Sequence, residues 1–158
     1  MRVFGVSGFS GTGKTSLVES IVNRLVLEGH SVITVKSSSH EMHGEQGTDT
    51  ERHRLAGAKE SYFRGPSNRN KLLRDLVGST SSEFLIVEGM KTSPIPKFWC
   101  IGNSQLGDTI PIEVKAIISW DPSIVEDKYG LPIINASDMD QVIGIIKEEA
   151  VDLDSIDV

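Results

Sequence analysis

The segment GFSGTGKTS, residues Gly8–Ser16, matches the phosphate-binding pattern G-x-x-x-x-G-K-[ST] at every required position. It follows an apolar, β-branched run over residues 2–7 that predicts a buried strand. Apolar residues then recur at helical spacing from residue 17 to 25, and Gly29 is placed to end that helix. Strand, glycine-rich loop and helix therefore follow one another in the order that a nucleoside triphosphate site requires.

Each residue type in this loop suits one part of a triphosphate. Glycines allow a close backbone approach that a Cβ atom would block, and the N–H groups at the start of the helix attract an oxyanion. Lys14 offers a point charge to the β- and γ-phosphates, and the Thr15 hydroxyl suits Mg²⁺. The predicted nucleotide contacts in the loop are Gly8, Ser10, Gly11, Thr12, Gly13, Lys14, Thr15 and Ser16. A chance glycine-rich turn, the alternative, does not account for the flanking strand and helix.

Composition and charge set limits on the function. The chain has 158 residues, 38% of them hydrophobic and 24% charged, with a net charge of −6. An acidic chain is a poor match for broad nucleic-acid binding, which needs basic surface. Apolar runs are too short to cross a bilayer, and the first predicted strand starts at residue 2, so we expect no membrane span and no targeting peptide. The single cysteine, Cys100, fits a reducing cytoplasm.

A second strand and an acidic strand end complete the predicted site. Residues 31–36 form an apolar run after the first helix, which predicts a parallel strand–helix–strand unit with a right-handed crossover. Residues 83–89, EFLIVEG, hold four consecutive apolar residues, as a central parallel strand requires. Glu88 at the end of that run is predicted to face the loop and bind Mg²⁺; a solvated glutamate is the alternative. Lys14 and Glu88 are the predicted catalytic residues.

The remaining pattern predicts an α/β fold of the P-loop NTPase type, a three-layer sandwich around a mostly parallel sheet. Helices are expected at 49–58, 67–77 and 138–149, and further strands at 61–63, 97–101, 114–119 and 131–134. The proline- and glycine-punctuated segment 92–113 is either an extension that packs on a second subunit or an ordinary edge hairpin. Residues 1–151 are predicted to form one nucleotide-binding domain, and the acidic tail 152–158 is expected to be frayed and disordered.

Some polar residues allow two interpretations. Asp121, which follows a predicted strand, either accepts hydrogen bonds from a guanine or caps a short helix. Arg52 and Arg54 are candidates for contact with a phosphate or a substrate anion, and simple surface arginines are the equal alternative. His40 and His43 invite a zinc interpretation, but a tetrahedral site needs more ligands. We therefore favour solvated or phosphate-facing histidines.

Taken together, these residues resemble the family of molybdopterin-guanine dinucleotide biosynthesis protein B, MobB. The family pattern runs from a phosphate loop through a lysine-histidine-rich loop, G-x-D-[ST], A-G-A, V-E-G-[FM]-K and P-x-P-K. Here these motifs appear in the same order as Gly8–Ser16, Lys36–His40, Gly47–Thr50, Ala56–Ala58, Val87–Lys91 and Pro94–Lys97. The later motifs make the match specific. Ser37 departs from it, because the family usually has histidine directly after the lysine.

The resemblance implies a cytoplasmic GTP-binding protein with weak, Mg²⁺-dependent GTP hydrolysis. Such a protein is expected to assist the MobA-like guanylyltransferase that attaches GMP to molybdopterin, and to form a homodimer whose extra strands, within 92–113, join across the interface. Thr15, Asp49 and Glu88 match the positions that bind Mg²⁺ in this group of proteins. Arg54 matches an arginine before A-G-A that is expected to contact an anion.

Two other functions stay open at this point. The fold group includes ATP-dependent small-molecule kinases and ligases, although no arginine-rich lid follows the middle strands of this chain. A metal-insertion GTPase that uses His40 and His43 is the third hypothesis. The chain carries no N-K-x-D motif of the Ras-like type, so the preferred base does not follow from a motif.

Overall fold

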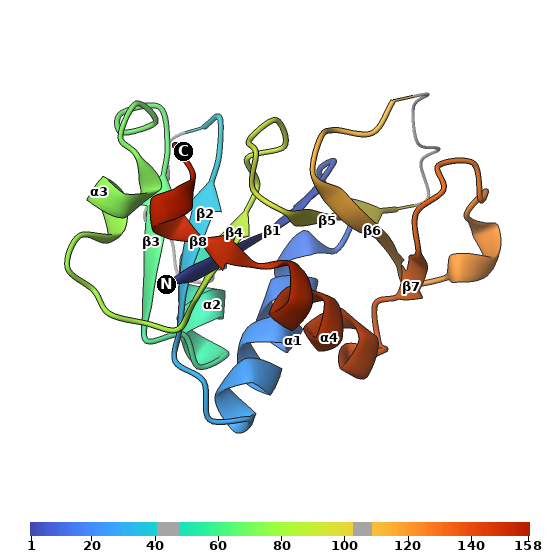
Figure 1. Ribbon diagram of the computed structural model, residues 1–158, viewed down its shortest axis with the longest axis horizontal. Coiled ribbons are helices and arrows are strands. Elements are labelled where there is room, and N and C mark those ends of the chain that lie inside the picture. The colour runs from blue at the N-terminus through green and yellow to red at the C-terminus, as the bar shows by residue number, and fades with distance from the viewer. Residues whose placement is uncertain (41–47, 103–108) are drawn as a thin grey trace.

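The computed structural model describes residues 1–40, 48–102 and 109–158. The strands are β1 (Arg2–Gly8), β2 (Val32–Ser37), β3 (Glu60–Arg64), β4 (Phe84–Glu88), β5 (Lys97–Ile101), β6 (Val114–Ser119), β7 (Ile133–Asn135) and β8 (Val151–Asp152). The helices are α1 (Lys14–Leu27), α2 (Asp49–Leu55), α3 (Leu73–Val77) and α4 (Met139–Glu149), with the 3₁₀ turns η1 (Pro122–Ile124) and η2 (Leu153–Ser155). Strands run in the order β3-β2-β4-β1-β5-β6-β7, and every pair on this path is parallel (Figure 1).

Helices cover both faces of this sheet, so the central strands are buried on both sides. Phe4 and Ile86 belong to one apolar cluster with α1 and α4, whereas Val3 and Leu85 belong to a second with α3 and the chain end. Successive side chains of each central strand point alternately into the two buried layers. The sequence of these strands is therefore a continuous apolar run. The predicted α/β architecture with a mostly parallel sheet is confirmed.

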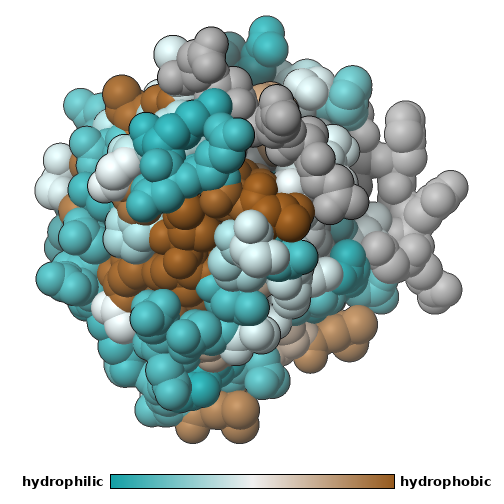
Figure 2. All heavy atoms as spheres, turned by 90° about the vertical axis from the view of Figure 1, so that its right-hand side faces the viewer, coloured by the Kyte–Doolittle hydropathy of each residue, from teal (hydrophilic) through white to brown (hydrophobic). Residues whose placement is uncertain are grey.

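A third apolar cluster lies over β5 and β6. Its buried members are Trp99, Ile101, Val114 and Ile117, and partly buried side chains from residues 125–133 pack against it. Figure 2 looks onto the side of the molecule that carries β7, where apolar side chains gather between polar ones. In the described parts of the chain, no helix is long and apolar enough to cross a membrane.

Strand β5 lies inside the sheet, which contradicts both interpretations of segment 92–113 for this strand. It pairs with β1 on one side and β6 on the other, and all five of its residues are buried. Since β4 pairs with residues 2–6 of β1 and β5 with residues 5–8, β5 starts level with the end of β4. The short connection 89–96 therefore suffices, and neither an edge hairpin nor an intersubunit extension contains β5. Residues 103–108 lie outside the described residues.

The acidic tail is ordered, which differs from the expected frayed end. β8 pairs antiparallel with residues 2–3 of β1, beside the half of β1 that β5 does not reach. Leu153 packs into the cluster with α3, and its N–H donates to the Met1 carbonyl (2.9 Å). The acidic side chains stay exposed, but the backbone groups at this edge of β1 need partners and the tail supplies them.

Helix α3 is shorter than the helix predicted over residues 67–77. The side chain of Asn68 accepts from the Gly65 N–H (2.8 Å) and donates to the Phe63 carbonyl (3.0 Å). These local bonds hold the chain in a turn in place of the first helical turns.

Candidate functional site

The glycine-rich loop, residues 8–16, leaves the carboxyl end of β1 and enters α1. Gly8 and Gly13 have φ of 146° and 83°, conformations that side chains rarely adopt. Contacts exclude side chains as well: a Cβ atom on Gly8 would collide with the Cys100 carbonyl oxygen, and one on Gly13 with the Trp120 indole. Both glycines are therefore required by packing as well as by the backbone.

The amino end of α1 is suited to an anion. Gly13 caps the helix without a side-chain hydrogen bond, and the first turn carries no acidic residue, so no side chain offsets the positive end of the helix dipole. Lys14 adds a full charge, and its ammonium donates to the Phe9 carbonyl (2.5 Å). Burial lowers the pKa of Lys14, while the charge of Glu88 opposes that decrease. A phosphate would offer Lys14 a stronger acceptor than this carbonyl.

A cavity of about 300 Å³ lies in front of the loop. Its walls are loop residues 10–16 together with Lys36, Asp49, Arg52 and Glu88. These side chains come from β2, α2 and β4, so the cavity lies at the carboxyl edge of the parallel sheet, where open α/β folds bind ligands. A larger groove of about 420 Å³ between α1 and α2 includes no residue of the loop, so we take the smaller cavity as the site.

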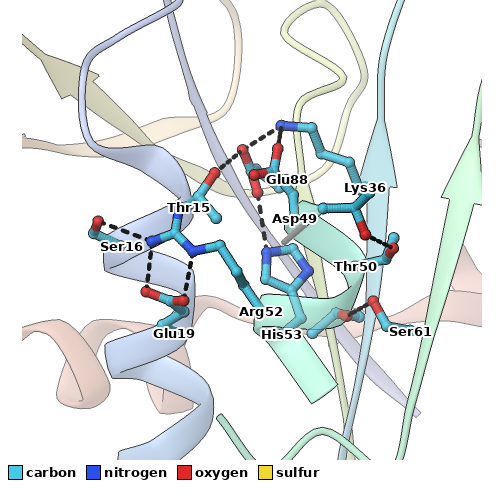
Figure 3. A network of polar contacts seen from close by, with 12 residues as sticks. Thr15, Ser16, Glu19, Lys36, Asp49, Thr50, Arg52, His53, Ser61 and Glu88 are labelled. Atoms are coloured by element: carbon cyan, nitrogen blue, oxygen red, sulfur yellow. Dashed lines mark hydrogen bonds and ion pairs between the residues drawn. The ribbon is translucent and has the colours of Figure 1, made fainter. Parts of the chain in front are cut away.

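Glu88 is the centre of a polar network (Figure 3), and its side chain is only 1% exposed. Thr15 Oγ1 donates to Glu88 Oε1 (2.9 Å), and Lys36 Nζ donates to the same oxygen (2.5 Å). His53 Nε2 lies 3.0 Å from Glu88 Oε2. Burial alone would raise the pKa of Glu88, but the His53 hydrogen bond and the Lys36 charge outweigh it and hold the pKa at about 2. Glu88 is therefore an ionised acceptor for three donors.

Asp49 joins this network through Lys36, whose ammonium lies 2.5 Å from Asp49 Oδ2. Thr48 caps α2 by accepting the N–H of Glu51, which makes Asp49 the first residue of the helix. The three side chains predicted to bind Mg²⁺ thus lie close together: Asp49 and Glu88 share the Lys36 ammonium, and Thr15 bonds to Glu88.

The donor set fits a magnesium ion. Two carboxylates and a hydroxyl are hard oxygen ligands of the kind Mg²⁺ prefers, and it usually takes its other ligands from water and phosphate. The ammonium between the carboxylates shows that the site already holds a cation there. Among the described residues no three His, Cys, Asp or Glu side chains form a metal cluster. The zinc interpretation depends on His43, which lies outside the described residues.

The structure does not bring Arg54 and Asp121 to the cavity. Arg54 is exposed on α2, whereas Arg52 lines the cavity and donates to the Glu19 carboxylate (2.7 and 2.8 Å). Residues two apart on a helix do not share a face, so only one of the two arginines can point inward. Asp121 caps η1 and accepts from the N–H and hydroxyl of Ser123 (3.2 and 2.5 Å), as the cap interpretation expects.

His53 and Lys36 are the contributors that sequence reasoning does not single out. His53 is fully buried, and its Nε2 must carry the proton because Glu88 is an acceptor; its Nδ1 has no hydrogen-bond partner within the described part of the chain. The spacing of four residues between Asp49 and His53, which places both on one helix face, is the signal that could have pointed to it. Lys36 reaches Glu88 because the two are paired in the register of β2 with β4, which no local pattern reveals.

Two exposed aromatic side chains flank the loop. Phe9 is 48% exposed, packs edge-on against Trp99 with ring centroids 5.6 Å apart, and carries the Lys91 ammonium 5.0 Å from its ring. Trp120 is 50% exposed and lies against Gly13. Half-exposed aromatic rings beside a cavity favour contact with a flat ligand or a partner protein.

Together the fold and the site define a class: an α/β protein whose glycine-rich loop joins the first strand to the first helix and faces an acid on the neighbouring strand. The sequence model of one family, described as Molybdopterin guanine dinucleotide synthesis protein B, MobB, matches residues 3–120. The chain belongs to the MobB family.

Relatives with assigned names agree with this membership. The chain is 29% identical over 108 residues to the molybdopterin-guanine dinucleotide biosynthesis adapter protein of Haemophilus influenzae, an alignment that covers 60% of each chain. It is 27% identical over 165 residues to a putative adapter protein of the same description from Methanocaldococcus jannaschii, covering 96% of this chain and 63% of that protein. The chain thus spans 60% and 63% of the lengths of these two relatives.

Solved structures confirm the fold. Bacillus subtilis MobB superposes with a TM-score of 0.67 at 24% identity, covering 94% of this chain and 98% of that one. A MobB homologue from Bacillus stearothermophilus gives a TM-score of 0.55 at 22% identity, covering 93% and 96%.

Proposed function

We propose that this chain binds GTP and Mg²⁺ at the glycine-rich loop and acts as an accessory protein in the formation of molybdopterin guanine dinucleotide. It assists a MobA-like guanylyltransferase in the cytoplasm, functions as a homodimer and hydrolyses GTP only weakly. The strongest support is the cavity that the glycine-rich loop lines together with the carboxylates of Asp49 and Glu88, in a chain that belongs to the MobB family. Both named relatives are described as adapter proteins.

Each group at the cavity has a role in this proposal. Lys14 leaves the Phe9 carbonyl and contacts the β- and γ-phosphates. Thr15, Asp49 and Glu88 hold Mg²⁺, which supplies neutralisation of the phosphate charge when bound. Since Arg52 is already paired with Glu19, a phosphate must compete with a carboxylate for it, which agrees with weak hydrolysis.

Asp121 and Trp120 are the proposed contacts of the guanine base. Asp121 follows β6 at the edge of the sheet that carries the loop, and Trp120 before it lies against Gly13. A guanine that donates to both oxygens of Asp121 must displace the bonds from Ser123. The base would then lie beside the indole of Trp120, which can stack on it.

Intrinsic fluorescence tests the nucleotide site directly. Of the two tryptophans, Trp99 is buried and Trp120 is half exposed beside the loop, so GTP with Mg²⁺ should change the Trp120 emission saturably. Lys14→Ala should weaken binding about 10- to 100-fold, because a charge-assisted contact contributes about 1.5–3 kcal/mol. Lys59→Ala, which removes an exposed lysine whose ammonium donates to the Ser81 carbonyl away from the loop, is the matched control and should bind normally.

The accessory role requires a separate assay. Purified guanylyltransferase converts GTP and molybdopterin to the dinucleotide, and addition of this chain should raise the rate or yield. Lys14→Ala should not reproduce the increase, whereas Lys59→Ala should. Normal GTP binding with no effect of the wild-type chain on guanylyl transfer would contradict the accessory role while leaving the nucleotide site intact.

A further inference from the structure

The Lys36 ammonium lies where the two acidic side chains of the site converge. Its Nζ is 2.5 Å from Asp49 Oδ2 and 2.5 Å from Glu88 Oε1, the oxygen that also accepts from Thr15. The side chain is 19% exposed, and Asp49 is 32% exposed, so this ion-pair triad faces the cavity. Figure 3 shows the lysine reaching across from β2 to both carboxylates.

A divalent ion at the point where Asp49 and Glu88 converge would take the position of the Lys36 ammonium, which already binds Asp49 Oδ2 and Glu88 Oε1. Mg²⁺ binds carboxylate oxygens at about 2.0–2.1 Å and tolerates little departure from octahedral geometry. An ammonium 2.5 Å from both oxygens leaves no room for that shell, and the two cations repel each other at such a separation. Lysine and metal therefore exclude one another at this position.

We propose that Lys36 is an internal counter-cation that keeps divalent metal out of the nucleotide-free site and gives up the carboxylates when a triphosphate arrives. The inference rests on the proposed function, since it assigns the order in which metal and nucleotide enter that same cavity. Lys36 lines the cavity together with the loop, so phosphate oxygens in the loop offer its ammonium new acceptors within reach of a flexible side chain. Metal then enters with the phosphates and not before them.

The rest of the network keeps the carboxylate in place during this exchange. His53 is fully buried and bonds to Glu88 Oε2, the oxygen that Lys36 does not touch. Thr15 belongs to α1 and donates to Oε1. Glu88 is thus held from two sides when Lys36 leaves, and the atom that moves is the lysine Nζ. Lys36 therefore does not hold the metal but sets when the metal binds.

Metal binding to nucleotide-free protein tests this inference. Mn²⁺ serves as the probe, followed by electron paramagnetic resonance or by calorimetry, with no nucleotide present. We expect Lys36→Met, which keeps the length of the side chain without the charge, to bind Mn²⁺ at least tenfold more tightly than wild type. Lys91→Met is the matched control, since Lys91 acts on Lys14 through its charge but makes no bond to Asp49 or Glu88. It should leave Mn²⁺ affinity unchanged.

Several results would overturn the inference. Equal Mn²⁺ affinity in wild type and Lys36→Met would do so, as would an equal gain in Lys91→Met, which would indicate a general charge effect. Should Lys36→Met fail to fold, Lys36→Gln carries the same expectation. Adding a non-hydrolysable GTP analogue should raise the Mn²⁺ affinity of wild type far more than that of the variant. A wild-type protein that does not bind GTP would contradict the proposed function alone. The comparison of Mn²⁺ affinity between wild type and Lys36→Met is made without nucleotide and does not depend on GTP binding.

Discussion

Replacing Glu88 with glutamine tests how much the buried carboxylate contributes to stability. The pKa of Glu88 is held at about 2 against an ordinary value of 4.5, because His53 and Lys36 outweigh the effect of burial. Each pKa unit corresponds to about 1.36 kcal/mol, so the folded protein favours the ionised carboxylate over a neutral side chain by about 3 kcal/mol. Glu88→Gln should therefore lower the free energy of unfolding at pH 7 by about 3 kcal/mol, or the melting temperature by about 6–12 °C.

The pH dependence gives this prediction its sign. Since the folded-state pKa lies below the unfolded value, the contribution is complete above about pH 4.5 and disappears as the pH falls toward about 2. Urea unfolding of wild type and Glu88→Gln at several pH values should show a difference that shrinks over that interval. Glu83→Gln is the matched control: this exposed glutamate precedes the same strand and pairs with His30, so its loss should cost less than about 1 kcal/mol. A difference below about 0.5 kcal/mol at pH 7, or one that does not change down to pH 3, would show that the ionised Glu88 carboxylate does not stabilise the fold in this way.

Three further substitutions test the packed tail, the buried Lys97 and the glycine-rich loop. Leu153→Ala should destabilise the protein by about 2–5 kcal/mol in urea unfolding, because the tail side chain is buried; a loss under about 0.5 kcal/mol would show that the tail does not pack. Burial lowers the pKa of Lys97 to about 8, so the unfolded chain binds more protons between about pH 8 and 10.5 and stability should rise with pH across that window. Lys97→Met should flatten this rise, and an unchanged slope would argue against the low pKa. Gly13→Ala should lower the free energy of unfolding by about 1–2 kcal/mol in thermal unfolding, because residue 13 has a positive φ. It should also abolish the GTP-induced fluorescence change, because the new methyl group meets the Trp120 indole. Normal GTP binding by this variant would contradict the role given to the loop.

The parallel core of the fold could be predicted because its signals are local. Apolar runs at residues 2–7, 31–36 and 83–89 fall on β1, β2 and β4, and the glycine-rich loop lies between the first strand and the first helix. The position of β5 could not be predicted in this way, since it depends on how far this strand is displaced along β1. The ordering of the tail depends on the same displacement. Because β5 pairs with residues 5–8 of β1, residues 2–3 of β1 are free to pair with β8.

The site shows the same division between local and tertiary information. Lys14, Thr15 and Glu88 follow from motif and strand position, and the cavity brings them together as expected. The sequence did not show which arginine faces the cavity. The motif of the family indicates Arg54, but the rotation of α2 about its axis directs Arg52 to the cavity. The bridging role of Lys36 requires the strand order β2-β4-β1, which a sequence read one segment at a time does not contain.

Competitive binding of GTP against ATP, with and without Mg²⁺, tests most directly whether this chain is a GTP-binding protein. We predict a clear preference for GTP that depends on Mg²⁺ in the wild-type protein and that weakens in Glu88→Gln. Equal binding of the two nucleotides, or a preference for ATP, would contradict the assignment to GTP-dependent cofactor maturation and would favour an ATP-dependent kinase or ligase.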